Sequence, residues 1–224
     1  MEPDKAVIWD LDGVIADTAP FHFQAWKELV ERRGRNFTRE DFRHSFGLRN
    51  ETILKSIFGE LSAEEIESLS REKEELFRQK VKGNIKSLPG VLKLLRTLKR
   101  EKFKIGLVSS TPIENINLIL SSLKISGYFD CLISAKDVQR GKPDPEGFLL
   151  AAKKLGVEPK YCIVIEDAVA GVEAAKAAGM KCIALTTTHP RDALAKADLV
   201  VDNLEGVGKK ELRHLLFSTW GDSK

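Results

Sequence analysis

Residues 7–18 have the sequence VIWDLDGVIADT, and this stretch decides the fold. An apolar run is followed by Asp10, Asp12 and Asp17, with Gly13 between the second and the third aspartate. A short apolar run bounded by polar residues is typical of a strand that is buried on both faces of a parallel sheet. We therefore expect a buried strand that ends on closely spaced carboxylates, which is a costly arrangement unless a cation or a chemical role accounts for it.

Further apolar runs follow the first one along the chain. They are KIGLV at 104–108, CIVIE at 162–166, CIAL at 182–185 and DLVV at 198–201. Amphipathic patterns separate them; Ile113, Ile116 and Ile119, for example, recur at helical spacing. Strands that alternate with helices indicate βαβ units. We predict an α/β fold, namely a doubly wound parallel sheet of the Rossmann type.

The alternation fails between the first two predicted strands, where about 70 residues carry helix signals and no convincing strand. Thr38 with Asp41, and Ser62 with Glu65, have the spacing of capping boxes. Most charges of the run SREKEELFRQK are expected on a solvated helix face. SLPG at 87–90 would return the chain to the sheet. The predicted domains are a core of 1–16 and 88–224 and an inserted, all-helical cap of 17–87.

The composition is that of a globular protein, with 224 residues of which 42% are hydrophobic and 31% charged. Lysine plus arginine exceed aspartate plus glutamate by 36 to 33 and form no basic block, so we expect neither a nucleic-acid nor a membrane partner. Cys131, Cys162 and Cys182 are widely spaced beside aliphatic residues, which predicts reduced core thiols. With no secretory leader pattern and no long apolar run, we expect a cytoplasmic protein. We also expect it to be a monomer.

Polar residues directly follow three of the predicted strands. In open parallel sheets, ligands bind outside the carboxyl ends of the strands, so these side chains are expected to converge on one crevice. Crowded carboxylates repel one another unless a cation neutralises them, and Mg²⁺ prefers such oxygen ligands. A magnesium site beside hydroxyls and a lysine suits phosphoryl transfer. The residues of this expected site are Asp10, Asp12, Ser109, Ser110, Thr111, Lys142, Glu166 and Asp167.

Four motifs, in order along the chain, carry a family resemblance. They are Asp10-Leu-Asp12-Gly13-Val-Ile, Ser109, Lys142-Pro143 and Glu166-Asp167. Together they resemble the motifs of the haloacid dehalogenase (HAD) superfamily of phosphotransferases, whose core is Rossmann-like. The helical insertion, which begins with DTAPFHFQAWKEL, is similar to the cap of the subgroup that includes β-phosphoglucomutase and small sugar-phosphate phosphatases.

The resemblance implies a role for each motif residue. Asp10 would be the nucleophile that is phosphorylated, and Asp12 the general acid and base. Ser109 would hold the transferred phosphoryl group, and Lys142 would neutralise it. The implied cofactor is Mg²⁺, held by Asp10, Asp12, Glu166 and Asp167. The alternative role of Glu166 is to support the other ligands without contacting the metal. Family members that cleave carbon–halogen bonds or phosphonates lack an acid at the position of Asp12, so the implied substrate is a phosphate ester.

Substrate contacts are expected from the cap and from the hydroxyl side chains that follow the second predicted strand in the sequence. The loop FGLRNETIL at 46–54 is similar to a mutase loop that carries an arginine for the substrate's second phosphate, but here Asn50 holds that position and Arg49 comes one residue early. Asparagine cannot replace a bidentate guanidinium, which puts mutase activity in doubt. The predicted substrate-binding residues are His22, Trp26, Gly47, Arg49, Asn50, Lys73, Ser110 and Thr111.

Some histidines, and some of the predicted substrate contacts, have an alternative interpretation. His22 and Trp26 could serve packing or a hinge at the start of a cap helix, and Lys73 could be a solvated helix lysine. His44, His189 and His214 have no partner motif and are interpreted as surface residues.

The leading prediction is a Mg²⁺-dependent phosphotransferase that acts through an aspartyl-phosphate, as a phosphatase of small phosphorylated metabolites such as sugar phosphates. The alternative within the family is β-phosphoglucomutase. A phospho-receiver signalling domain also combines acidic residues, a hydroxyl and a lysine on a parallel sheet. Its phosphorylated aspartate, however, ends a strand in the middle of the chain, whereas Asp10 ends the first strand, and a receiver needs no cap. Multiple turnover of a phosphate ester would exclude a receiver.

Overall fold

The computed structural model describes residues 3–217 and contains a six-stranded parallel sheet. The strand order is β3-β2-β1-β4-β5-β6, so the chain begins in the middle of the sheet and is wound outward in both directions. This is the predicted doubly wound α/β sheet. Its strands are β1 (Ala6–Trp9), β2 (Lys104–Val108), β3 (Cys131–Ile133), β4 (Cys162–Glu166), β5 (Lys181–Leu185) and β6 (Leu199–Val201).

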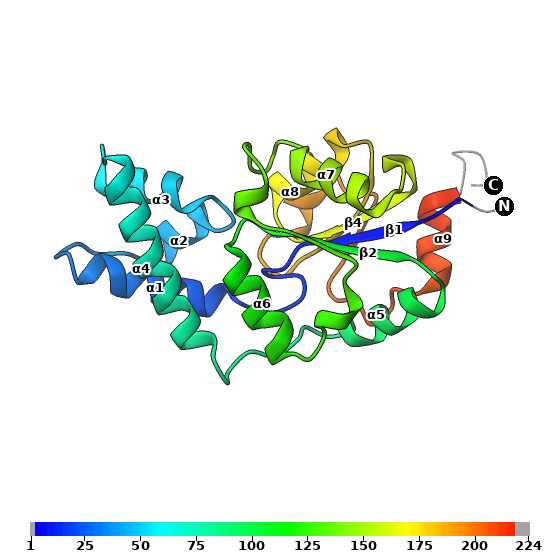
Figure 1. Ribbon diagram of the computed structural model, residues 1–224, viewed down its shortest axis with the longest axis horizontal. Helices are drawn as coiled ribbons and strands as arrows, with labels where there is room; N and C mark the ends of the chain where they lie inside the picture. Colours follow the sequence, from blue (N-terminus) through cyan, green and yellow to red (C-terminus); the bar gives the residue numbers. More distant parts are fainter. Residues whose placement is uncertain (1–2, 218–224) are drawn as a thin grey trace.

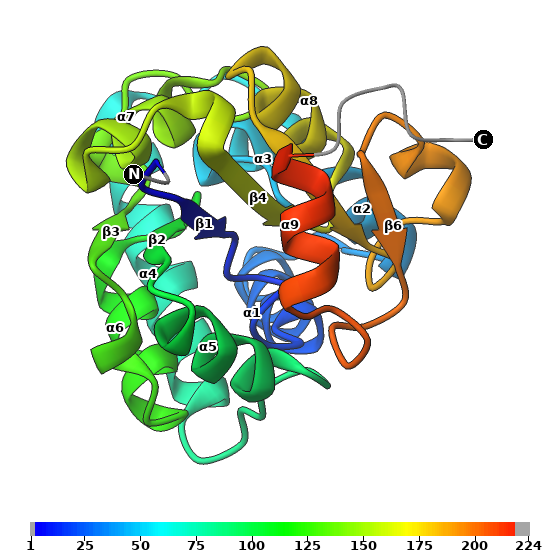
Figure 2. The same cartoon turned by 90° about the vertical axis from the view of Figure 1, so that its right-hand side faces the viewer.

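Helices cover both faces of the sheet. Helices α7 and α8 lie on one face, and α5, α6 and α9 lie on the other (Figures 1 and 2). Each face buries its own cluster of apolar side chains, as expected for a parallel sheet with two covered faces. These helices are α5 (Val91–Arg100), α6 (Ile113–Ser122), α7 (Glu146–Leu155), α8 (Val169–Ala177) and α9 (Lys209–Phe217).

All five predicted strands are present, to within one residue at each end. The strand β3 is absent from the sequence prediction. It has three residues, and only Ile133 among them is fully buried, so neither length nor pattern marks it as a strand. Its position is set by pairing with β2, where Val108 lies level with Ile133.

The register of the central strands brings polar residues to one edge. Trp9 lies level with Leu107 of β2 and with Ile165 of β4. Asp10 therefore comes level with Glu166, and its backbone N–H donates to the carbonyl of Ile165 at 2.9 Å. The strand order reverses between β1 and β4, which is where ligands bind in doubly wound sheets.

Helices between β1 and α5 form a layer beyond the carboxyl end of β1 (Figure 1). Both predicted capping boxes are present: the hydroxyl of Thr38 accepts from the N–H of Asp41 at 3.1 Å, and that of Ser62 from the N–H of Glu65 at 3.2 Å. We call this layer the cap. Its helices are α1 (Ala19–Glu31), α2 (Arg39–Ser45), α3 (Asn50–Phe58) and α4 (Ala63–Val81).

The two segments that connect the cap with the sheet run side by side. Ala16 and Ser87 form an antiparallel bridge, and the N–H of Leu88 donates to the carbonyl of Ile15 at 2.9 Å. The predicted boundaries, 16/17 and 87/88, fall on this pair of segments. Residues 1–2 and 218–224 of the predicted core lie outside the described residues.

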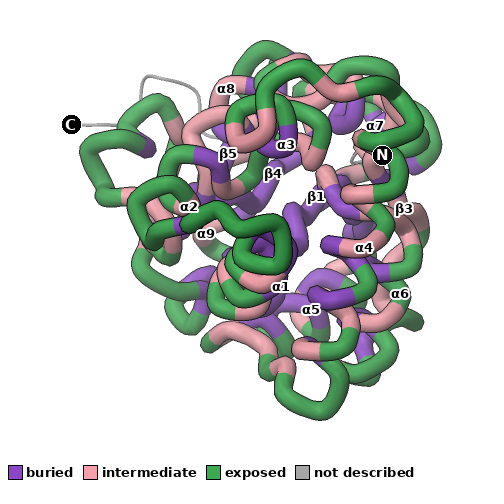
Figure 3. The backbone as a smooth tube through the Cα atoms, turned by 90° about the vertical axis from the view of Figure 1, so that its left-hand side faces the viewer, coloured by how far each residue is buried: buried purple, intermediate pink, exposed green. Residues whose placement is uncertain are grey.

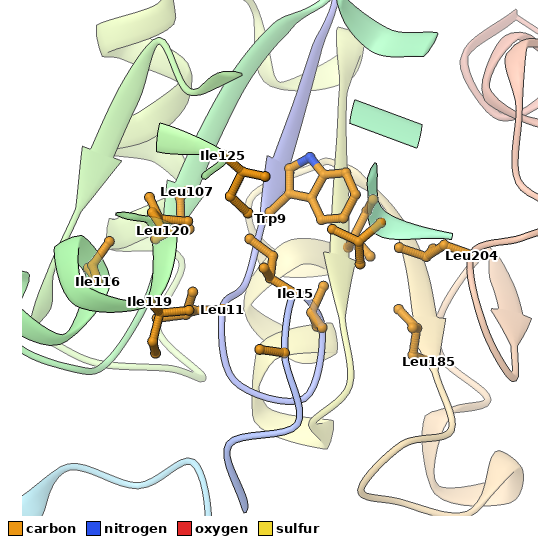
Figure 4. Packing of buried hydrophobic residues seen from close by; sticks show 14 of the residues in the cluster. Trp9, Leu11, Ile15, Leu107, Ile116, Ile119, Leu120, Ile125, Leu185 and Leu204 are labelled. Carbon is orange, nitrogen blue, oxygen red and sulfur yellow. The ribbon is translucent and has the colours of Figure 1, made fainter. Parts of the chain in front are cut away.

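Apolar side chains fill the space between the sheet and its covering helices. Trp9 is fully buried and lies among aliphatic side chains that include Ile15 and Ile125 (Figure 4). Figure 3 shows burial along the strands and exposure on the outer turns of the helices. Within the described residues, Nε1 of Trp9 has no hydrogen-bond partner, so the ring contributes through its apolar volume, on the order of 2–3 kcal/mol for a buried aromatic side chain.

The three cysteines are free thiols, as predicted. Cys162 and Cys182 are buried, and Cys131 is half-buried. Burial raises the pKa of Cys162 to about 12, so this thiol stays protonated at neutral pH. Among residues 3–217, no helix combines the length and the apolar character needed to cross a bilayer. The cytoplasmic location and the monomeric state remain predictions.

Gly90, which precedes α5, lies in a contact that only glycine permits. Its φ is +87°, and a Cβ would lie 2.2 Å from the carbonyl carbon of Leu204. Gly34 has a φ of +69° but open space around it. We predict that Gly34→Ala lowers the free energy of unfolding by about 1–2 kcal/mol, the cost of a left-handed alanine, and that Gly90→Ala lowers it by more than about 3 kcal/mol. Urea unfolding followed by circular dichroism measures both, and equal losses would contradict the packing argument.

Candidate active site

A cavity of about 320 Å³ lies between the cap and the carboxyl ends of the strands. Segments that follow β1, β2 and β4 contribute to it from the sheet, and α1, α4 and the loop after α2 contribute from the cap. Ser109 and Arg49 instead line a neighbouring cavity of about 20 Å³. The predicted site residues that line the larger cavity are Asp10, Asp12, His22, Trp26, Gly47, Asn50, Lys73, Ser110, Thr111, Lys142, Glu166 and Asp167.

The ammonium group of Lys142 joins two of the carboxylates. It donates to Oδ1 of Asp10 and to Oε1 of Glu166. Burial lowers the pKa of Lys142, but the two carboxylates outweigh this effect and raise it above its ordinary value. The lysine therefore stays charged, and it offsets the repulsion between Asp10 and Glu166.

Glu166 holds its neighbours with both of its oxygens. It is fully buried, and Oε2 accepts from the backbone N–H groups of Asp167 at 2.8 Å and Ala168 at 2.9 Å. Gly171 makes room for this carboxylate, since a Cβ there would lie 1.8 Å from Oε1. These contacts favour the supporting role of Glu166 over direct metal ligation.

The protein by itself disfavours the charged forms of Asp10 and Asp167. Burial, with a contribution from neighbouring carboxylates, raises the pKa of Asp10 to about 8 and that of Asp167 well above its ordinary value. The hydroxyl of Thr188 donates to Oδ2 of Asp167 at 2.6 Å. This same carboxylate oxygen lies close to the backbone of Gly13. Within residues 3–217, Oδ2 of Asp10 and Oδ1 of Asp167 have no hydrogen-bond partner.

A divalent cation fits these two oxygens. Within the described residues, no three His, Cys, Asp or Glu side chains form a complete metal-binding group. Mg²⁺ needs no such group, because it keeps several waters and is commonly held through one or two carboxylates. The donor set thus suits Mg²⁺ at Asp10 and Asp167, whereas the carboxylates of Asp12 and Glu166 have other partners.

Asp12 is held apart from the ion pair of Asp10. Its Oδ1 accepts from the hydroxyl of Thr18 at 2.5 Å and lies 3.3 Å from Nε2 of His22. Its Oδ2 lies 3.5 Å from Oγ of Ser109. Burial raises the pKa of Asp12, but the contacts with His22 and Thr18 outweigh it and lower the pKa below its ordinary value. The two aspartates of the motif therefore have different electrostatic environments.

His22 connects Asp12 with the cap. Nζ of Lys73 lies 2.8 Å from Nδ1 of His22, and an ammonium group can only donate, so Nδ1 accepts and Nε2 carries the proton that faces Asp12. The imidazole also stacks on Phe77, with 3.9 Å between ring centroids. Burial and the positive charge of Lys73 lower the pKa of His22, which favours the neutral ring.

The cap loop places Arg49 and Asn50 in different environments. The guanidinium of Arg49 donates to the carbonyls of Gln139 at 2.9 Å and Val138 at 3.2 Å. The amide of Asn50 donates to Oε1 of Glu74 at 2.7 Å. Arg49 thus contacts the core loop that precedes Lys142, a placement that differs from its predicted contact with substrate.

The residues that follow β2 in the chain, together with Trp26 of α1, complete the surroundings of the cavity. Ser109 is buried, and its Oγ accepts from the N–H of Thr111 at 3.2 Å. Ser110 and Thr111 line the cavity itself. Trp26 is buried in the cap, and Nζ of Lys73 lies 5.2 Å from its ring centroid. Trp26 therefore belongs both to the cavity wall and to the packing of the cap.

Glu74 and Asn115 are absent from the predicted site. They are buried, and Nδ2 of Asn115 donates to Oε2 of Glu74 at 2.5 Å. A sequence signal was available for both. Asn115 lies four residues before Ile119 in the apolar stripe of α6, and Glu74 lies three residues before Phe77 in α4. A polar residue on a buried helix face needs a partner.

Two histidines interpreted as surface residues line the cavity. His44 is exposed, whereas His189 is half-buried, with Nδ1 3.1 Å from the carbonyl oxygen of Asp167. The surface interpretation is therefore wrong for His189. No local pattern indicates this position, because the fold alone brings the loop after β5 next to Asp167.

Comparisons with known proteins show which family this chain is similar to. Residues 7–185 match the family described as haloacid dehalogenase-like hydrolase. The chain is 40% identical over 208 residues to beta-phosphoglucomutase of Bacillus subtilis, covering 88% of each chain. It is 35% identical to a phosphorylated carbohydrates phosphatase of Thermotoga maritima, covering 80% of this chain and 83% of the relative. The solved beta-phosphoglucomutase of Clostridium difficile has a TM-score of 0.87 and 33% identity, covering 95% and 97% of the two chains.

The contacts of His22 predict a pH effect. A buried histidine with a lowered pKa binds fewer protons than in the unfolded chain, so its contribution to stability is lost as the pH falls below about 6.5. Lys73→Met removes the positive neighbour and should raise the pKa of His22, whereas Lys27→Met, at an exposed position of α1, should not. Imidazole NMR titration measures the pKa, and an unchanged value in Lys73→Met would contradict the contact.

Proposed function

Because the chain belongs to the haloacid dehalogenase-like hydrolase family and is a phosphoric monoester hydrolase or phosphotransferase, we propose that it is a Mg²⁺-dependent phosphatase of small phosphorylated metabolites such as sugar phosphates. The observation that carries this proposal is the separation of the two motif aspartates. Asp10 is paired with the charged Lys142, and Asp12 is held by Thr18 and His22.

Asp10 is the proposed nucleophile. Its Oδ2 would hold the cation, and its Oδ1, oriented by the hydrogen bond from Lys142, keeps a lone pair to attack phosphorus. The attack forms an aspartyl-phosphate and breaks the ester bond to the leaving alcohol. Lys142 neutralises charge on the transferred group. A water molecule then attacks the phosphorus atom, which releases phosphate and restores the carboxylate of Asp10.

Asp12 is the proposed general acid and base. Thr18 and His22 hold its Oδ1, so Oδ2, near Ser109, is the oxygen left to exchange a proton. The negative charge of a bound phosphate raises the pKa of a neighbouring carboxyl group, which favours the protonated acid when substrate is present. Asp12 then protonates the leaving alcohol and later accepts a proton from the attacking water.

Mg²⁺ is the proposed cofactor, and Asp10 and Asp167 would hold it. Burial, together with neighbouring carboxylates, raises the pKa of both carboxyls, and a bound dication would favour their charged forms. When bound, the ion supplies charge neutralisation for the phosphoryl oxygens. Glu166 supports this arrangement through Lys142 and through the backbone of Asp167.

The cap side of the cavity favours a phosphatase over a mutase. A mutase has to hold a second phosphate while the sugar turns over, and a guanidinium fork suits that task. Here the guanidinium of Arg49 contacts backbone carbonyls of the core, and the amide of Asn50 contacts Glu74. The similarity to the Thermotoga maritima phosphatase named for phosphorylated carbohydrates supports sugar phosphates as the substrate class.

The mechanism predicts different losses for the two aspartates. With a panel of sugar phosphates and Mg²⁺, Asp10→Asn should release no phosphate, and Asp12→Asn should be slower by about 10²- to 10⁴-fold. Asp12→Asn should still form an aspartyl-phosphate from acetyl phosphate, because acetate leaves without a proton. Excess chelator should abolish turnover, and Asp202→Asn is the surface control. Phosphate trapped on a residue other than Asp10, or full activity in chelator, would contradict the mechanism.

The position of Arg49 predicts that the phosphoryl group is transferred mainly to water and not to a second position of the sugar. Incubation with β-glucose 1-phosphate, Mg²⁺ and a trace of the 1,6-bisphosphate should release free phosphate and form little glucose 6-phosphate. A coupled assay for glucose 6-phosphate, run beside a phosphate assay, measures both products. Rapid formation of the 6-phosphate without phosphate release would establish the mutase alternative. In that case Arg49→Ala should abolish the reaction, because the guanidinium would have to leave Val138 and Gln139 for the substrate.

A further inference from the structure

Asn115 of the core helix α6 lies between two charged side chains of the cap helix α4. Its Nδ2 donates to Oε2 of Glu74 at 2.5 Å, and its Oδ1 accepts from NH1 of Arg78 at 3.1 Å. Glu74 and Arg78 are four residues apart and therefore neighbours on one face of α4. One side chain amide of the core thus meets an acceptor and a donor of the cap at the same time.

The contact between Asn115 and Glu74 is buried, and it gives the Glu74 carboxylate a hydrogen-bond donor. Asn115 is 0% exposed and Glu74 is 4% exposed. Glu74 also accepts from Lys73 at 2.8 Å and from Asn50 at 2.7 Å. Burial raises the pKa of Glu74, but the positive charge of Lys73 leads the effects that lower it below its ordinary value. A buried carboxylate of this kind depends on its donors, and among them Asn115 is the one that belongs to the core.

The same carboxylate is linked to the reaction site. Glu74 contacts Nζ of Lys73, Lys73 donates to Nδ1 of His22, and Nε2 of His22 faces Asp12. On the core side, Nδ2 of Asn115 also donates to Oγ1 of Thr111, which lines the cavity. A continuous chain of hydrogen bonds therefore connects the contact between α4 and α6 with the proposed general acid.

We propose that Asn115 is the core half of a latch that holds the cap closed, and that Glu74 is a positioning residue that, through Lys73 and His22, orients Asp12 only while the latch is engaged. This role rests on the proposed function, because it assigns the latch to the phosphoryl-transfer site. Opening of the cap separates α4 from α6, so Glu74 loses its core donor and Asn115 loses both charged partners. Closure and alignment of the acid are thereby coupled.

A pair of substitutions that moves the negative charge from Glu74 of the cap to position 115 of the core tests the latch. Asn115→Asp places a carboxylate against Glu74, and two buried carboxylates repel each other. Adding Glu74→Gln restores a complementary pair: the glutamine Oε1 still accepts from Lys73 and Asn50, and its Nε2 donates to the new carboxylate. Arg78 and Thr111 keep a partner in this double variant, since both can donate to a carboxylate. Asn117→Asp, on the exposed side of the same helix, is the matched control.

Two readouts separate a latch from a general loss of structure. Small-angle X-ray scattering measures the separation of cap and core without any substrate, and circular dichroism confirms folding. Rapid-quench trapping measures formation of the aspartyl-phosphate on Asp10. Asn115→Asp should increase the radius of gyration and slow phosphorylation by sugar phosphates at least tenfold. Phosphorylation by acetyl phosphate, whose leaving group needs no acid, should change less than twofold.

The double variant should recover at least half of the lost rate and the original radius of gyration, and Asn117→Asp should match the wild type. If Asn115→Asp does not fold, Arg78→Met weakens the latch from the cap side and should give the same pattern, with about a threefold loss. Unchanged dimensions and rates in Asn115→Asp, equal losses with both substrates, or failure of the double variant to recover would overturn the proposal. If the wild type forms no phosphoenzyme, the proposed function fails, and the scattering data still decide whether the latch exists.

Discussion

The structure depends on one shared positive charge. Lys142 lies between the carboxylates of Asp10 and Glu166, which end neighbouring strands of a buried sheet. Without that ammonium group, the register that brings β1 level with β4 would place two buried anions against each other, which costs several kcal/mol per uncompensated charge. The lysine allows the carboxylates to remain at the edge of the sheet. Burial still disfavours the charged forms of Asp10 and Asp167, and for that reason this edge of the sheet suits a bound cation.

The cap forms the wall of the cavity that faces the edge of the sheet. It joins the core through two paired segments at Ala16 and Ser87. Farther out, it contacts the core through polar groups: Arg49 on carbonyls of the core loop, and Glu74 on Asn115. Polar contacts of this kind suit a cap that opens and closes, because each group can be hydrated when the contact breaks, whereas a large apolar interface would resist opening.

The fold could be predicted from local patterns because the interactions that form its elements are local. The apolar runs of β1, β2, β4, β5 and β6 indicated their strands, and the capping boxes at Thr38 and Ser62 indicated two helix starts. The strand β3 could not be predicted, because three residues of mixed burial become a strand only through pairing with β2. The solvated-face interpretation of the charged run in α4 suits most of its charges and fails for Lys73 and Glu74, which turn toward the cavity.

For the site, the sequence by itself determined which chemical groups gather at the edge of the sheet. The strand ends are set by short apolar runs, so Asp10, Asp12 and Asp167 could be assigned to one crevice before the structure was known. Only the tertiary structure decided how each group is used. Glu166 holds Lys142 and the start of α8, Arg49 contacts the core loop, and His189 comes next to Asp167. Glu74 and Asn115 meet across the cap and the core. The physical reason is distance along the chain: partners 41 residues apart, such as Glu74 and Asn115, are selected by packing and charge in three dimensions, which no local pattern of residues encodes.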